Sequence, residues 1–266
     1  MQLTADCARC AGLCCVAPAF SVSADFAIDK AAGQPCPHLL PDFRCGIHDR
    51  LRQRGFPGCA SYDCFGAGQQ VTQVTFGGRD WRATPRLAGQ MFRVFAVMRA
   101  LHEQLWQLTE AVALRPDGPL RAELAAALAE TERLTTADAD ALEALDLARH
   151  RRAGTALLRR ASEQVRARAR RPRVDLGGAD LIGKDLRGAD LAGANLRGAR
   201  LIGATLAGAD LSLADLAGAD LRAADLAGAD LRSSIFLSQP QLEAAHGDRA
   251  TALPPSRTAP AHWRAR

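Results

Sequence analysis

The sequence predicts a multi-part α+β protein built from differently patterned regions. Three observations carry this prediction. All eight cysteines lie in the first 64 residues, apolar residues recur at helical spacing in the middle of the chain, and a leucine returns every fifth residue from Leu176 to Leu231. We therefore expect a small Cys-rich metal module at residues 1–83, a helical connector at 84–172, a four-sided β-helix at 173–236, and a capping helix with a proline-rich tail at 237–266.

The N-terminal region indicates the chemistry of the cysteines. The segment MQLTADC lacks the basic stretch and apolar core of a secretory signal, so we expect a cytoplasmic protein. No run of about 18 apolar residues predicts a membrane span. Thiols stay reduced in the cytoplasm, which favours metal or redox chemistry over disulfides.

The spacing of the cysteines favours metal binding. Cys7 and Cys10 form a C-x2-C pair that can reach one ion, whereas adjacent Cys14 and Cys15 would strain the backbone on a single ion. Thiolates are soft ligands, so zinc or an iron–sulfur cluster is the expected occupant, with the choice left open. His38 and His48 are weaker candidates. The predicted metal ligands are Cys7, Cys10, Cys14, Cys15, Cys36, Cys45, Cys59 and Cys64.

This block resembles the CxxCxxCC zinc- or iron-chelating domain family. The leading cysteines match its first motif, and Cys36, the sequence CGIH at 45–48, and the closing pair Cys59 and Cys64 match its later pattern. The middle spacing departs from the motif, with three residues instead of two between Cys10 and Cys14. The resemblance implies a metal centre and covers about residues 7–65.

The next segments predict one strand and about three helices. Val71 to Phe76 alternates between apolar and polar residues, which predicts a strand. A long amphipathic helix should follow Pro85, because its apolar residues recur at three- and four-residue steps. The sequence RPDGP at 115–119 should end it, a second helix should run to about Leu134, and Thr135 or Thr136 can cap a third.

The connector ends in a basic run. Between Arg149 and Arg173 there are ten arginines and one acidic residue, Glu163. Such a run can dock nucleic acid or another anionic surface. No aromatic residues for base stacking are interleaved, so a solvated helix face, partly neutralised by the acidic coil, is the favoured interpretation.

The five-residue leucine period excludes ordinary secondary structure. On an α-helix, residues five apart would scatter around the axis, and on a strand they would alternate between faces. The period fits a chain that turns a corner every five residues and closes after four corners, so that about 20 residues form one coil. Two residues after the leucine, glycine stands in nine of twelve repeats and can supply a positive φ at each turn.

These repeats resemble the pentapeptide-repeat family, whose motif is A(D/N)Lxx. The resemblance covers about Val174 to Phe236 and implies a right-handed quadrilateral β-helix. In this register Lys184 occupies an inward position that is alanine in ten of twelve repeats, so we expect a distorted corner there. Outward residues form columns, which read Asp190, Asp210, Asp230 on one face; Asp180, Arg200, Asp220 on another; and Ile182, Ile202, Arg222 beside it.

Some members of this family that confer quinolone resistance mimic DNA and bind DNA gyrase. That activity needs a long negative rod, whereas this coil has three turns and nine Asp against one Lys and five Arg. Gyrase binding is therefore the least favoured function.

The C-terminal segment predicts a cap for the coil. Ser238 and Gln241 fit a capping box, Gly247 suits the helix C-terminus, and Trp263 is expected to anchor an extended tail.

The sequence favours a non-enzymatic metal-binding scaffold that presents its coil to a protein partner. An iron–sulfur or thiol-dependent redox or transfer enzyme is the alternative. No catalytic residues can be assigned by spacing, since the repeat explains the aspartates of the coil.

Overall fold

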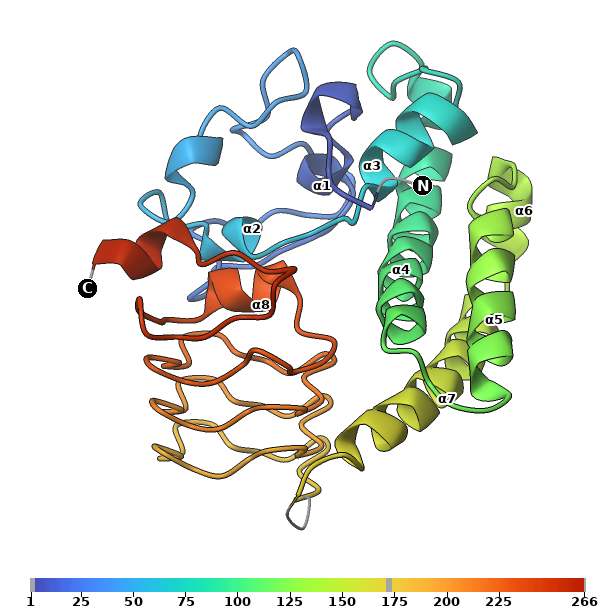
Figure 1. Ribbon diagram of the computed structural model, residues 1–266. Coiled ribbons are helices and arrows are strands. Elements are labelled where there is room, and N and C mark those ends of the chain that lie inside the picture. The colour runs from blue at the N-terminus through green and yellow to red at the C-terminus, as the bar shows by residue number, and fades with distance from the viewer. Residues whose placement is uncertain (1–2, 171–173, 266) are drawn as a thin grey trace. The chain divides into compact units, whose positions relative to one another are not determined.

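The computed structural model describes residues 3–170 and 174–265. Contacts divide the chain into two compact units, one comprising Met1–Val112 with Arg121–Leu158, and the other Ala113–Leu120 with Arg159–Arg266. Figure 1 traces the chain through its elements. No helix of the described residues is long and apolar enough to cross a bilayer. The four-part division at residues 83, 172 and 236 stays a prediction.

The Cys-rich segment folds into short helices joined by loops. Two isolated antiparallel bridges, Phe20 with Lys30 and Leu39 with Cys45, tie the loops together. Ile47, Leu51 and Phe56 form a small core beneath them. The helices are η1 (Cys7–Arg9), α1 (Leu13–Val16), η2 (His48–Arg50) and α2 (Pro57–Ala60).

The predicted strand at Val71 to Phe76 is wrong, because this segment is helical. A short α3 (Ala67–Gln69) continues into the π-helix η3 (Gln70–Thr75). Thr72 donates its hydroxyl to the Gly68 carbonyl at 2.9 Å and accepts the Ala11 amide at 3.1 Å. The six residues are apolar at positions 71, 74 and 76, a pattern too short to separate a strand from a helix, and here tertiary packing selects the helix.

The helical middle region is confirmed. After η4 (Pro85–Leu87), α4 runs over Ala88–Ala113 and α5 over Leu120–Leu134, separated by the predicted break. The apolar stripe of α4 is buried, from Met91 through Met98 to Leu108.

The third helix begins later than predicted. Asp138, not Thr135 or Thr136, caps α6 (Ala139–Ala144) by accepting the Ala141 amide at 2.8 Å. The two threonines instead donate their hydroxyls to carbonyls of the last turn of α5. A further helix, α7 (Leu147–Arg166), carries the basic run.

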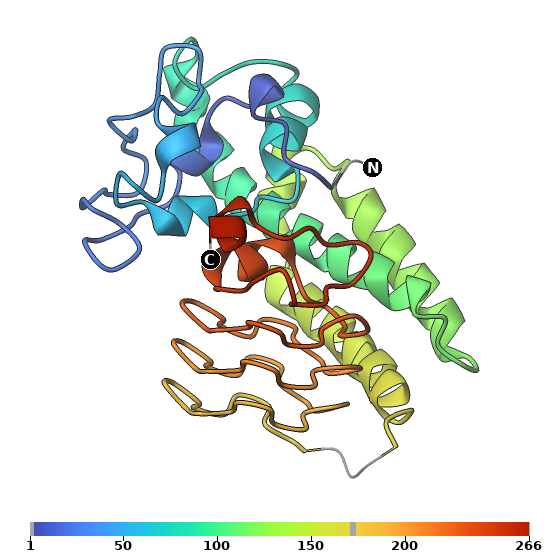
Figure 2. The ribbon, with the colours of Figure 1, turned by 60° about the vertical axis from the view of Figure 1, so that its left-hand side comes forward.

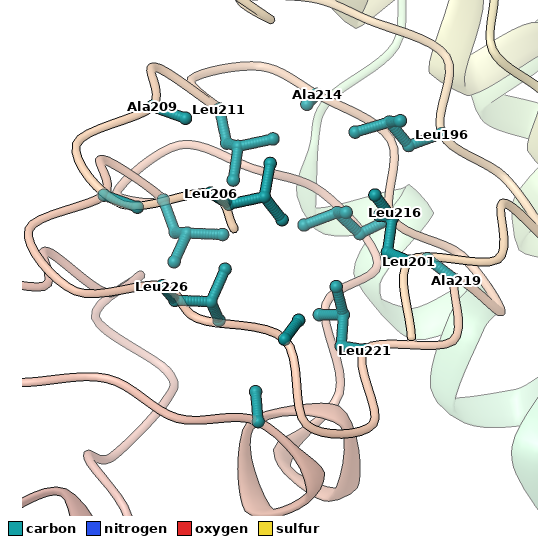
Figure 3. Packing of buried hydrophobic residues seen from close by; sticks show 14 of the residues in the cluster. Leu196, Leu201, Leu206, Ala209, Leu211, Ala214, Leu216, Ala219, Leu221 and Leu226 are labelled. Atoms are coloured by element: carbon teal, nitrogen blue, oxygen red, sulfur yellow. The ribbon is translucent and has the colours of Figure 1, made fainter. Parts of the chain in front are cut away.

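The four-sided coil is confirmed by its backbone pairing. Parallel bridges join residues 20 apart, from Asp175 with Asn195 to Asp210 with Asp230, so each turn of the coil uses 20 residues. Each bridge is one residue long, and the stacked turns are visible in Figure 2. Leucine and alanine side chains point into the coil (Figure 3), and Leu196 to Leu231 are almost fully buried.

The corner at Lys184 is not distorted. Its amide donates to the Leu181 carbonyl at 3.2 Å, and Gly183 has a φ of 63° like the glycines of the other turns. The Lys184 side chain is exposed, which avoids the cost of burying an ammonium.

The C-terminal segment closes the coil. The capping box of α8 (Gln239–Ala244) is confirmed. His246 and Ala252 then add bridges to Asp225 and Asp230. Trp263, 1% exposed, donates its indole N–H to the Ala245 carbonyl at 2.9 Å, as expected for an anchor, and lies in the last helix η5 (Ala261–Ala265).

Gly247 has a role other than the predicted helix terminus. The helix ends at Ala244, and Gly247 does not adopt a positive φ. A Cβ atom at this position would lie 2.6 Å from the Trp263 ring. The glycine is therefore required for close packing of the indole.

Candidate thiol-lined functional site

The Cys-rich segment lines a partly open cavity of about 650 Å³. All eight predicted cysteines line it, and so do both candidate histidines, His38 and His48. These residues lie between positions 5 and 64 of the sequence, so the folding of one short segment builds the whole wall.

Short helices and backbone hydrogen bonds position the first cysteines. Cys7 begins η1, and Cys14 and Cys15 lie in α1. The Cys36 amide donates to the Cys15 carbonyl at 2.9 Å, which brings the second cysteine group against the first. Cys10 is accommodated by Gly68, where a Cβ atom would lie only 2.5 Å from the Cys10 sulfur.

The remaining cysteines are held by the loop bridge and by α2. Cys45 is bridged to Leu39, and Cys59 lies in α2. The Cys64 carbonyl accepts the Ala67 amide at 2.9 Å, which joins this cysteine to the start of α3. A few backbone contacts thus bring together cysteines that lie up to 57 residues apart in the sequence.

All eight cysteines are free thiols. The Cys14 and Cys15 sulfurs lie 3.9 Å apart. Over residues 3–170 and 174–265, no three Cys, His, Asp or Glu side chains converge as they would around a bound ion. The thiols thus line one cavity without converging, so a shared metal ion would require rotation of their side chains toward a common point.

Burial governs the protonation of most of these thiols. Desolvation raises the pKa of Cys10 to about 11 and that of Cys59 to about 12. The hydrogen bond between Cys14 and Cys15 raises the pKa of Cys14 and lowers that of Cys15. Cys15 is thus the thiol of this pair that ionises first.

Lys30 does not line the cavity, but it is a buried charged residue near Cys15 that the cysteine pattern did not indicate. It is 6% exposed, and its ammonium donates to the carbonyls of Val16, Ala31 and Gln34 at 2.9–3.1 Å. Its charge contributes to the lowered pKa of Cys15, after the hydrogen bond from Cys14. A buried lysine in a loop has no sequence signature, so only the fold could reveal it.

Aromatic rings complete the wall and were also missed. Phe20 and Phe26 stack with centroids 4.4 Å apart, and the His38 ring meets Phe56 edge-on at 5.3 Å. The available signal was the concentration of aromatic residues among the cysteines, which is higher than in the rest of the chain. These rings make the cavity predominantly apolar, which strengthens electrostatic interactions within it.

The structure describes the basic run as far as Arg170. Arg171 and Arg173 of the basic run lie outside the described residues, and Arg166 donates to the Gly193 carbonyl of the coil at 2.9 Å. Nucleic-acid binding by this run stays a prediction.

On the coil, arginines neutralise much of the acidic surface. Ion pairs join Asp180 with Arg200 and Asp185 with Arg187, and Asp220 and Asp230 pair in the same way with Arg222 and Arg232. A continuous negative rod of the kind that gyrase binding needs is not favoured by this pattern.

Residues 173–206 and 199–236 match the family model described as Pentapeptide repeats, with 8 copies. Over 266 residues, the chain is 56% identical to the uncharacterized protein YybG of Bacillus subtilis (strain 168), covering 99% of this chain and 95% of that protein.

Two solved pentapeptide repeat proteins are each similar over 32% of this chain. The protein alr5209 from Nostoc PCC 7120 is 38% identical, with 77% of its chain covered and a TM-score of 0.24. The protein AT2G44920 from the Arabidopsis thaliana thylakoid lumen is 29% identical, with 57% covered and a TM-score of 0.17. The predicted pentapeptide repeats are confirmed by the family model, and the resemblance of the cysteine block stays a prediction.

Proposed function

The chain belongs to the same family as YybG of Bacillus subtilis and carries pentapeptide repeats, and on this premise we propose that it is a metal-binding scaffold. Its N-terminal cavity holds a thiolate-bound metal centre, and its coil offers the surface for a protein partner. One observation carries the proposal: eight free thiols from several short helices and loops line a single cavity.

The donor set fits soft transition metals. Thiolates bind zinc and iron–sulfur clusters, and the apolar wall protects such a centre from water. A bound metal ion displaces the thiol protons. Its positive charge stabilises the thiolates of Cys10 and Cys59, which burial disfavours, as their raised pKa values indicate. His38 and His48 are reserve ligands on the same wall.

The number of thiols favours a centre with more than one metal ion. A tetrahedral zinc uses four ligands, whereas the cavity offers eight sulfurs in about 650 Å³. The short distance between the Cys14 and Cys15 sulfurs suits ligands shared between neighbouring ions. Two zinc ions would use all eight thiolates, whereas one iron–sulfur cluster would use four of them and still hold more than one metal ion.

The coil supports a scaffolding role. Leucine and alanine fill its interior, and arginines pair with several of its outward carboxylates. The coil therefore offers outer faces for binding rather than a reactive pocket. A redox or transfer enzyme working at the thiol cavity is the second candidate, favoured by the unequal pKa shifts of Cys14 and Cys15.

Elemental analysis and a visible spectrum of anaerobically purified protein test the proposal. We expect at least two equivalents of zinc or iron per chain, with sulfide and absorption near 400 nm if the centre is iron–sulfur. Cys15→Ser and Cys59→Ser should each lower the metal content, whereas Asp49→Asn, an exposed change outside the cavity wall, should not. A folded protein without zinc or iron would refute the proposal. A spectrum that changes reversibly with a chemical reductant would favour the redox candidate.

A further inference from the structure

The two ends of the coil differ in whether another segment of the chain pairs with the backbone edge. At the C-terminal end, the amides of Ala223, Leu226 and Leu231 donate to the carbonyls of Ala244, His246 and Ala252, so the tail covers the last turn. Trp263 and Leu242 then seal its interior. Over the described residues, this end therefore offers less free coil edge than a turn without such a cover.

The first turn is open over the described residues. Asp175, Asp180 and Asp185 are bridged to the second turn, and the described part of the chain provides no bridge on their other side. Three of the four leucines of this turn, Leu176, Leu181 and Leu186, are only partly buried, whereas Leu191 and the leucines of later turns are buried. Val174 and Ile182 are 44% and 43% exposed.

An exposed edge with unpaired amides and carbonyls recruits another strand. Among the described residues, positions bridged on one side only follow three sides of a square, with apolar side chains at the centre. The complement of that outline is another four-sided coil with the same spacing of bridges. Within this protein, the first turn of a second copy is the coil edge that fits.

Lys184 stands at an inward corner of this open turn. The equivalent corners of the buried turns carry small residues such as Ala194, Ala204 and Ser234. The Lys184 side chain is exposed, and a side chain at this inward register reaches water across the open edge. Lys184 makes no ion pair with any residue that the structure describes, so pairing of the edge would bury an uncompensated ammonium.

We propose that the open first turn is a self-association surface for a second copy of this chain, and that the charge of Lys184 keeps the two copies apart. Because the other end of each coil is sealed by its own tail, two first turns meet face to face. The contact is therefore isologous and closes as a two-fold dimer instead of growing into a fibre.

A two-fold contact brings two copies of Lys184 to one interface, so two ammonium groups would be buried there. Removing it should strengthen association by at least about tenfold per lysine, or about a hundredfold per dimer. Lys184→Ala restores the residue usual in this repeat position, and Lys184→Ser copies the residue found at Ser234; neither change should disturb the turn.

The test is analytical ultracentrifugation of the full chain over a concentration series. The parent protein and Lys184→Arg should sediment at the monomer mass of 28.3 kDa, at concentrations where Lys184→Ala and Lys184→Ser sediment at twice that mass. Arg187→Ala is the matched control, because it removes one positive charge from the same turn at an exposed, outward position. It should remain monomeric.

A double variant tests the location of the contact. Ala179→Lys combined with Lys184→Ala moves the cation to the neighbouring inward corner of the same turn and should restore the monomer. In the Lys184→Ala dimer, hydrogen exchange at the amides of Asp180 and Asp185 should slow. A folded Lys184→Ala that stays monomeric, an equal effect of Arg187→Ala, or unchanged exchange at both amides would overturn the proposal.

Discussion

Two turn positions of the coil that lack glycine adopt a backbone conformation that normally requires it. Leu213 and Ala223 stand two residues after the repeat leucine and have φ values of 56° and 55°, close to the 66° of Gly218. The coil therefore imposes this geometry on Leu213 and Ala223 even without glycine, whereas Ser233 at the same repeat position does not adopt it. The left-handed region costs a residue with a side chain about 1–2 kcal/mol.

Exchanging residues at this turn position should therefore change stability in opposite directions. Ala223→Gly should raise the free energy of unfolding by up to about 1 kcal/mol, since relief of strain exceeds the added entropy of the unfolded chain. Gly218→Ala should lower it by about 1 kcal/mol or more. Both positions are exposed, so packing changes little, and urea denaturation measures both effects. Equal shifts of the same sign would contradict the argument.

The buried thiols predict how stability depends on pH in the metal-free chain. Burial raises the pKa of Cys10 to about 11 and that of Cys59 to about 12, above the 9.0 of an unperturbed thiol. In the unfolded chain these groups lose their protons first as pH rises. Their contribution to stability is therefore complete below about pH 9 and is lost as pH rises toward 11 and 12.

Urea denaturation of the chelator-treated protein between pH 8 and pH 11 measures this loss. Cys10→Ser combined with Cys59→Ser should flatten the dependence above pH 9, because serine does not ionise in this range. A dependence that is as steep in the double variant would show that other groups are responsible.

At the scale of elements, the cap of α6 is the clearest difference between the sequence pattern and the fold. Asp138 accepts the Ala141 amide at 2.8 Å, whereas Thr136 donates to the Arg133 carbonyl at the end of α5. Asp138→Ala should lower the free energy of unfolding by about 1 kcal/mol, and Thr136→Ala by less. Thermal unfolding followed by circular dichroism compares them. A larger loss of unfolding free energy in Thr136→Ala would indicate that Thr136, not Asp138, caps α6.

The elements that could be predicted from the sequence are those with a long, strict pattern. Twelve leucines in one register specify the coil, and the apolar steps from Met91 to Leu108 specify α4. The six residues from Val71 to Phe76 are too few to separate a strand from a helix. The outcome depends on a long-range contact, in which the Thr72 hydroxyl accepts the Ala11 amide. The eight cysteines could be named because their residue type and spacing indicate metal binding. Lys30 could not, because only the fold places it near Cys15.

At the scale of the whole molecule, the division into two compact units gives metal binding a selective effect on stability. The cavity belongs to the unit comprising Met1–Val112 and Arg121–Leu158, whereas the pentapeptide coil belongs to the other. A ligand that binds a folded unit stabilises that unit by about 2.7 kcal/mol at a free concentration of 100 times its Kd. The buried leucines of the coil make no contribution to such a site.

Differential scanning calorimetry of the metal-loaded and the chelated full chain should therefore show one transition that moves and one that stays. The moving transition belongs to the thiol-lined unit, and Cys59→Ser should reduce its shift. Ala223→Gly should move the other transition in both samples, which assigns it to the coil because Ala223 lies in the second unit. Equal shifts of both transitions on chelation would mean that the units unfold together, and that the metal stabilises the chain as a whole.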